Sequence, residues 1–183
     1  MLYRIKRDPF LQWMRASYCA INLEVFGGEL PRIPIKVANT KKNGYDAAFA
    51  VMEKVYIQFT DNGEIEKTGP LRPSIIIGLH NASFDDYNKS LYPIELMAHE
   101  MIHLYCFLHG IINNDKDQYH NYNFIEAAEK HGMYCVQWSQ EYGFSDVRMT
   151  DEQFERVIDR IPNEIWKTVR DSIKTVNTPA PDE

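Results

Sequence analysis

The spacing of apolar residues predicts a helix near the start of the chain. Residues 8–28 place apolar side chains three and four positions apart, which puts them on one face of a helix. Gly27 and Gly28 follow this repeat directly and are suited to ending it. We interpret the segment as a packing helix whose inward stripe is Phe10, Trp13, Met14, Ser17, Ala20, Ile21 and Val25.

Segments with alternating or continuous apolar residues follow, and they predict strands. Two prolines exclude a helix just after the first one, and the alternation of Ile33, Ile35 and Val37 there predicts an edge strand. The β-branched run at residues 74–80 is the clearest strand of the chain. The pattern as a whole predicts strands at 30–40, 47–59 (broken part-way) and 74–80, a turn at 42–45, and loops at 60–70 and 81–90.

The helical pattern returns in the second half of the chain. Residues 92–110 form a strongly apolar helix, in which Pro93 suits the first turn and Gly110 the end. A further helix is predicted at residues 120–132, and an amphipathic one at 150–161. The order is therefore a helix, then strands, then helices.

The composition is that of an ordinary globular protein, and it restricts the partners we expect. The chain has 183 residues, of which 44% are hydrophobic and 25% charged. Its 20 Lys and Arg against 26 Asp and Glu give a net charge of −6, whereas a protein that lives mainly on nucleic acid is usually basic. This balance argues against DNA as the sole partner, although a local basic patch remains compatible with it.

The cysteines and the first residues predict a cytoplasmic protein. Cys19, Cys106 and Cys135 are far apart and form no CxxC pair, which favours free thiols in a reducing compartment and excludes a zinc ribbon. The first residues contain no continuous apolar run of a signal peptide, and no stretch approaches the roughly 20 apolar residues of a membrane span. We expect one domain with no membrane partner and a disordered tail at residues 176–183.

The apolar helix carries a pattern that points to chemistry. His99 and His103 are four residues apart, so both can face one metal ion from the same side of the helix. Glu100 lies about 100° around the axis from His99, which keeps it off the metal but within reach of a bound water. Zinc lowers the pKa of such a water to about 7, and the glutamate takes its proton. A histidine cluster satisfied by ordinary hydrogen bonds is the alternative interpretation.

A catalytic zinc ion needs a third protein ligand, and four other histidines compete for that place. His109 is ten residues beyond His99 on the helix and faces elsewhere. His131 sits at a helix end, where it would favour the helix dipole. His80 ends the central strand and could lie near the site. His120 opens the next helix after a connection long enough to fold back, which makes it the best third ligand.

Three stretches together resemble the SprT-like zinc metallopeptidases, a family that includes bacterial SprT and the eukaryotic Spartan proteases. They are residues 21–35, with Phe-Gly-Gly before Leu-Pro, residues 95–105, with the HExxH motif, and residues 119–133, with His120 and Phe124. The resemblance extends over about residues 8–135. HExxH alone occurs in many families, and its combination with the other two stretches is more specific.

The resemblance implies a fold, a site and an activity. The fold is α+β and zincin-like, a small mixed sheet packed with helices, in agreement with the order of elements above. Zinc is the implied cofactor, with His99, His103 and His120 as ligands, Glu100 as general base and Phe124 as a packing residue. The implied activity is peptide-bond hydrolysis, in some members of proteins crosslinked to DNA. An exposed strand, either the one near Phe49 or residues 74–80, would bind substrate as an added strand.

The chain also departs from the family pattern, and this leaves three classes of function open. Asn121 stands where the family usually has glycine, and neither a zinc ribbon nor another DNA-binding appendage is present in the sequence. The classes are a zinc endopeptidase, a peptidase confined to DNA-associated proteins, and a non-catalytic zinc-stabilised interaction domain. Basic residues at 3–7 and 167–174 are the only support for DNA association. Tyr119 or Tyr122 could assist the oxyanion, and residues 138–175 form a helical extension outside the resemblance.

Overall fold

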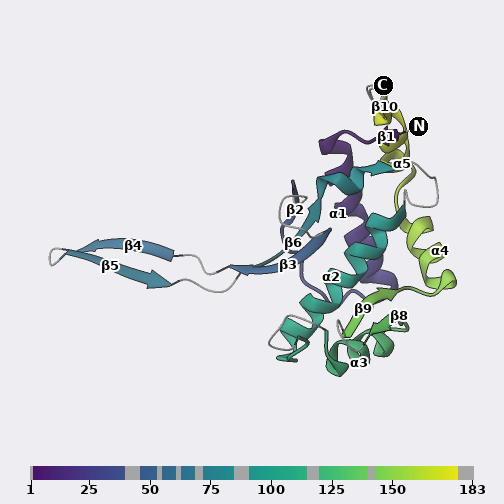
Figure 1. Cartoon of the computed structure of the whole chain (residues 1–183). Helices are drawn as coiled ribbons and strands as arrows, with labels where there is room; N and C mark the ends of the chain where they lie inside the picture. The colour runs from purple at the N-terminus through teal and green to yellow at the C-terminus, as the bar shows by residue number, and fades with distance from the viewer. Residues whose placement is uncertain are drawn as a thin grey trace, which may run out of the picture.

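A computed structural model describes residues 2–39, 46–52, 55–60, 63–68, 72–84, 91–114, 120–139 and 143–176. Its first helix, α1 (Arg7–Glu24), is the helix predicted from the apolar repeat, and the repeat is buried as expected. Trp13 is 1% exposed and lies 5.5 Å from the ring of Trp166 in α5 (Asn163–Ser172). Helices α4 (Asp151–Arg160) and α5 pack along α1, so residues after 150 complete the core (Figure 1).

A mixed three-stranded sheet lies against α1 and α2 (Tyr92–Leu108) (Figure 1). The strand order is β2 (Ile35–Ala38), β6 (Arg72–Gly78) and β3 (Ala47–Met52). β2 runs parallel to β6 and β3 antiparallel to it. Ile75 and Ile77 of β6 are fully buried because their side chains point into the layer of helices. The α+β fold with a small mixed sheet is thereby confirmed, as are the edge strand β2 and the central strand β6.

The prediction of a loop at residues 60–70 is wrong. β4 (Val55–Thr60) and β5 (Gly63–Thr68) pair as an antiparallel hairpin that projects from the sheet, away from the helices (Figure 1). Residues 63–68 are mostly polar, and they form a strand because β4 supplies a pairing partner, an effect that outweighs intrinsic preference. The predicted turn at 42–45 lies outside the described residues.

The segments around α2 are described only in part. Leu79–Ala82 form a 3-10 helix and Ser83–Phe84 form β7, in place of the first half of the loop predicted at 81–90. Residues 85–90 lie outside the described part of the chain. β7 pairs with β1 (Leu2–Arg4), which also pairs with β10 (Lys174–Val176), so both ends of the described chain meet in one sheet. Val176, the first residue of the tail expected to be disordered, lies in β10, and residues 177–183 lie outside the described residues.

Helix α3 (Tyr122–Lys130) follows α2 and packs against it (Figure 1). A hairpin of β8 (Tyr134–Ser139) and β9 (Gly143–Arg148) comes next, so the helical extension predicted at residues 138–175 is wrong at its start. Helix α4 begins as predicted, with Thr150 capping it: its side chain accepts a hydrogen bond from Gln153, whose own side chain returns to the Thr150 backbone. Among the helices of the described residues, none has both the length and the apolar character needed to cross a membrane.

Candidate metal centre

Helix α2 places His99 and His103 on one face, as their spacing predicts. Most residues of this helix are buried, since its apolar residues pack on α1, α3 and the sheet. The two histidine rings lie 5.2 Å apart on the side of α2 that faces a cavity. The surrounding core fixes the position of this helix, so it also fixes the spacing of the two rings.

His120 reaches the same point from another part of the chain. It pairs with Asn114 in an isolated antiparallel bridge just before α3, which folds the connection back onto α2. Its Nε2 lies 3.0 Å from Nε2 of His103, and the three histidines have ring nitrogens within 4.8 Å of one another. Zinc bonded to nitrogens at about 2.0–2.1 Å in a tetrahedral site holds them about 3.4 Å apart. The three residues are therefore positioned to hold one metal ion.

The environment keeps His99 and His103 neutral, which is the form of imidazole that binds metal. Burial, followed by repulsion from His103 and His120, holds the pKa of His99 well below its ordinary value. Burial and the nearby His120 lower the pKa of His103 to about 3, against a hydrogen bond with Asn113 that raises it. Protonating the cluster would place like charges together in a water-poor site. A cation is a better occupant than protons, because it is attracted to all three lone pairs at once.

Phe124 fills the space beneath the three rings. It is fully buried in α3, and its ring stacks on His120 at 4.0 Å with an interplanar angle of 13°. The same ring lies 4.7 Å from His103 and 5.1 Å from His99. The packing role expected of Phe124 is confirmed.

Asn121, which departs from the family pattern, begins α3. Its side chain accepts hydrogen bonds from the backbone N–H groups of Asn123 and Phe124, so it is the N-cap of the helix. This cap stabilises the helix start directly after His120. The substitution of asparagine for glycine is therefore compatible with the position of the third histidine.

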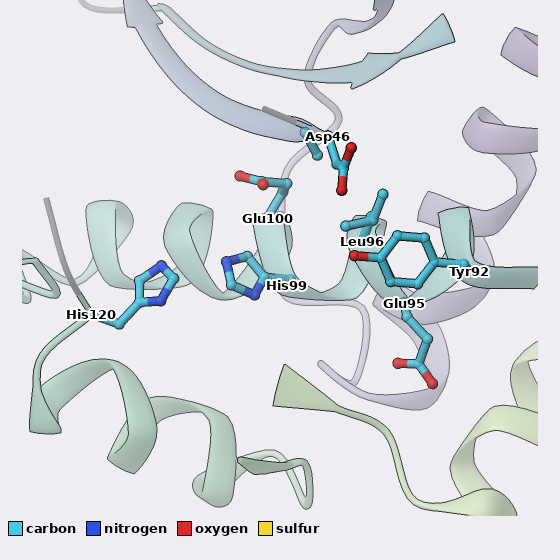
Figure 2. Close-up of a pocket in the computed structure, with 8 residues that line it drawn as sticks. Asp46, Tyr92, Glu95, Leu96, His99, Glu100 and His120 are labelled. Atoms are coloured by element: carbon cyan, nitrogen blue, oxygen red, sulfur yellow. The ribbon is translucent and has the colours of Figure 1, made fainter. Parts of the chain in front are cut away.

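Glu100 is a buried acid beside the triad. It is 5% exposed, and burial raises the pKa of its carboxyl to about 8, while a hydrogen bond with the Phe49 backbone acts in the opposite direction. Figure 2 shows Glu100 and His99 projecting from α2, with His120 facing His99 from the segment before α3. A positive charge held by the histidines would favour the ionised form of this carboxyl.

Two cavities meet at these residues. A cavity of about 170 Å³ adjoins His99, Glu100 and His120 and extends to Asp46 and Tyr92 (Figure 2). A larger one, of about 630 Å³, adjoins the same three residues together with His103 and runs along β3 to Phe107 and Ile111. The triad thus borders open space on both sides, which suits a site that admits a substrate.

The remaining candidates lie elsewhere. His80 pairs with Asp46 at 2.5 Å, near the small cavity but outside the triad. His109 packs on Tyr105, with 4.2 Å between ring centroids, and His131 Nδ1 lies 2.7 Å from the carbonyl oxygen of Ala127. Of the two tyrosines considered for the oxyanion, Tyr119 lies outside the described residues and Tyr122 is 72% exposed.

One polar contact at the centre was missed by the sequence analysis. The side chain of Asn113 lies 2.8 Å from Nδ1 of His103, on the opposite side of the ring from His120. Asn113 lies in a polar stretch, and the sequence pattern predicts only a connection between two helices there. Its position between two histidine-bearing elements was the only available signal.

Comparison with known proteins identified no relative of this chain. No protein-family model, no curated protein and no solved structure matched the chain. The chain carries a histidine triad consistent with an HExxH-type zinc site. The donor set of three neutral imidazoles suits zinc, copper, iron or nickel better than calcium or magnesium, which prefer oxygen ligands.

Proposed function

We propose that the chain is a zinc-dependent metallopeptidase of the SprT-like type. In this proposal His99, His103 and His120 hold zinc, and Glu100 is the general base that promotes peptide-bond hydrolysis. The observation that carries it is the meeting of three ring nitrogens within 4.8 Å of one another beside a buried glutamate. A buried carboxyl with a strongly shifted pKa in a cavity is typical of catalytic sites.

The residues of the chain would divide the work as follows. Zinc, when bound, supplies Lewis acidity and makes a water molecule more acidic. Glu100 holds or releases a proton at its carboxyl, and a nearby cation would bring its pKa down from about 8 towards neutral pH. A general base works best when its pKa lies near the working pH. Burial of the Glu100 carboxyl destabilises the fold, but the raised pKa that results suits this carboxyl to proton transfer.

The open edge of β3 supports a peptide as the substrate. The carbonyl of Asp46 accepts a hydrogen bond from the N–H of Gly78 in β6, so these two residues form a hydrogen-bonded pair. Along an antiparallel ladder, such pairs alternate with pairs that are not hydrogen-bonded to each other, and Ala47, Phe49 and Val51 belong to the second kind. The backbone groups of Ala47, Phe49 and Val51 therefore point away from β6. The N–H of Phe49 donates to the carboxyl of Glu100, so a peptide on this edge would pair with the backbone of Ala47 and Val51. Ala47 and Phe49 also line the larger cavity beside the triad. An extended peptide could pair with this edge and lie across the metal site.

A role confined to DNA-associated proteins has one specific observation in its favour. The two basic segments, which are far apart in the sequence, meet where β1 pairs with β10, with Arg4 opposite Lys174. Arg4, Lys6 and Lys167 are exposed. A basic patch of this kind would give binding to single-stranded DNA that weakens as salt is raised.

Two thiols support the cytoplasm as the place of action. Cys19 and Cys106 are free, and Cys19 is exposed. Exposed free thiols persist in a reducing compartment. This agrees with the compartment expected from the sequence.

The test uses the purified full chain. Bound metal is measured by elemental analysis, and cleavage of an unfolded protein such as casein is followed with and without a zinc chelator and with and without single-stranded DNA. We expect about one zinc per chain and cleavage that the chelator abolishes. Zinc without cleavage under any of these conditions would support the non-catalytic interaction domain instead. Absence of zinc, with stability unchanged by the chelator, would overturn the metal site itself.

A further inference from the structure

We propose that Asn113 is a positioning residue of the metal centre, which sets the orientation and tautomer of His103. The inference rests on the proposed metal site and goes beyond it, because Asn113 binds no metal and takes no part in proton transfer. Its side-chain Nδ2 lies 2.8 Å from Nδ1 of His103, and Nε2 of the same ring faces His120 at 3.0 Å. Asn113 therefore contacts Nδ1 of the ring, while Nε2 on the other side of the ring faces the proposed metal position.

The chemistry of the ring explains why this contact matters. A neutral imidazole carries its hydrogen on one nitrogen and a lone pair on the other. For Nε2 of His103 to offer a lone pair to a cation, Nδ1 must carry the hydrogen. The oxygen of the Asn113 amide can accept a hydrogen bond from that N–H. Such a partner fixes the ring orientation and makes the other nitrogen a better ligand.

The amide can also make the opposite contact. This is the arrangement in the structure, where the N–H₂ group faces Nδ1 and donates a hydrogen bond, and Nε2 then carries the hydrogen. A half-turn of the amide exchanges the two arrangements, because its oxygen and nitrogen occupy equivalent positions. The side chain also hydrogen-bonds the thiol of Cys106, one turn further along α2, so it is held beside the ring from two directions.

The backbone of Asn113 links the same loop to the third histidine. Its carbonyl accepts a hydrogen bond from the N–H of Asn121, the residue that follows His120, at 3.1 Å. The side chains of Asn121 and Asn123 both donate to the carbonyl of Ile112, at 3.0 and 2.8 Å. Asn113 thus contacts the ring of one histidine and the backbone next to another. Asn113 therefore fixes the position of His103 on α2 relative to that of His120 before α3.

The experiment compares two substitutions of similar size. Asn113→Asp keeps an oxygen that accepts from Nδ1–H, whereas Asn113→Leu removes every hydrogen bond of the side chain. Zinc affinity is measured by competition with a chelator, and the geometry of the site by the absorption spectrum of the cobalt-substituted protein. We expect Asn113→Leu to weaken zinc binding about 10- to 100-fold and to alter the cobalt spectrum. Asn113→Asp should bind zinc at least as tightly as the unmodified chain.

Asn123→Ala is the matched control. It removes a hydrogen bond to Ile112 in the same loop but touches no histidine. Equal losses in Asn123→Ala and Asn113→Leu would show that only loop packing matters, and would overturn the proposal. So would an Asn113→Leu variant with unchanged affinity, or an Asn113→Asp variant as weak as Asn113→Leu. If Asn113→Leu fails to fold, the comparison of Asn113→Asp with Asn113→Ala decides in the same way.

The outcomes also separate this inference from the proposed function. An unmodified chain that binds zinc and cleaves protein, with Asn113→Leu binding zinc equally well, contradicts the role of Asn113 alone. Conversely, zinc binding that depends on Asn113 in a chain that cleaves nothing supports the positioning role and contradicts the peptidase. A chain that binds no zinc contradicts both.

Discussion

His103 and His120 are 17 positions apart in the sequence, yet their Nε2 atoms lie 3.0 Å apart. Two neutral imidazoles at this distance can share a single hydrogen bond, whereas two protonated ones would repel each other. His99 approaches the same point from α2, with a ring centroid 4.7 Å from that of His120. Three imidazoles with ring nitrogens within 4.8 Å of one another, beside two cavities, are positioned to hold one ion.

Replacing His120, the proposed third ligand, tests this explanation directly. His120→Ala should weaken zinc binding by more than about 100-fold, because even the outer partner of a ligand contributes about 10- to 100-fold. The measurement is competition with a chelator of known affinity. His109→Ala is the control, since His109 is exposed at the C-cap of α2 and lies against Tyr105 instead. Similar affinities in the two variants would remove His120 from the site.

Replacing the proposed base separates binding from catalysis. Glu100→Gln preserves the size of the side chain and removes its capacity to take a proton, so zinc binding should remain within about threefold while cleavage falls about 10²- to 10⁴-fold. Glu126→Gln, on the exposed face of α3, should leave cleavage unchanged. Bound zinc and the rate of casein cleavage are measured on the same preparations. A Glu100→Gln variant that cleaves at the normal rate would assign the proton transfer to another group.

The sequence predicted the parts of the site that depend on local geometry. His99, Glu100 and His103 follow from helical spacing alone, because α2 has a clear start at Pro93 and a clear end before Gly110. The prediction of His120 as the third ligand depended on the resemblance to a family and on the assumption that the connection after the helix folds back. The position of Asn113 depends on where that connection returns, which no local pattern encodes.

The strands that were missed share one physical cause. β5 and the β8–β9 hairpin are short, and each is paired with a neighbouring strand. Preference for a strand is set largely by the partner and by burial, so a polar segment such as residues 63–68 gives little sign of it. The central strand β6 was predictable because it is buried on the helix-facing side and rich in isoleucine.

Phe124 should stabilise the fold and the metal site together. It is fully buried and stacks on His120, so Phe124→Ala should lower the free energy of unfolding by about 3–5 kcal/mol. Phe124→Leu, which fills more of the space, should cost less. Urea unfolding of the metal-free proteins gives the first quantity, and chelator competition gives zinc affinity. If Phe124→Leu restores stability but not affinity, the flat ring itself is needed to orient His120.

Gly132 tests how closely the end of α3 packs on the start of α4. Its φ of +73° lies in the left-handed region, and a Cβ there would come within 2.8 Å of Nε2 of Gln153. That side chain donates to the carbonyl of His131 at 2.7 Å and accepts from the N–H of Thr150, so displacing it disturbs the cap of α4 as well. Gly132→Ala should therefore cost the backbone penalty of about 1–2 kcal/mol plus about 0.5–1.5 kcal/mol for each hydrogen bond lost.

Gly27→Ala supplies the matched control for that measurement. Gly27 has a φ of +61°, and a Cβ there would meet nothing within 4 Å, so this variant carries the backbone penalty alone. The difference in unfolding free energy between the two variants, measured in urea, isolates the contact with Gln153. We expect Gly132→Ala to be the less stable by about 1–2 kcal/mol. Equal stabilities would mean that the Gln153 side chain moves aside without losing its hydrogen bonds.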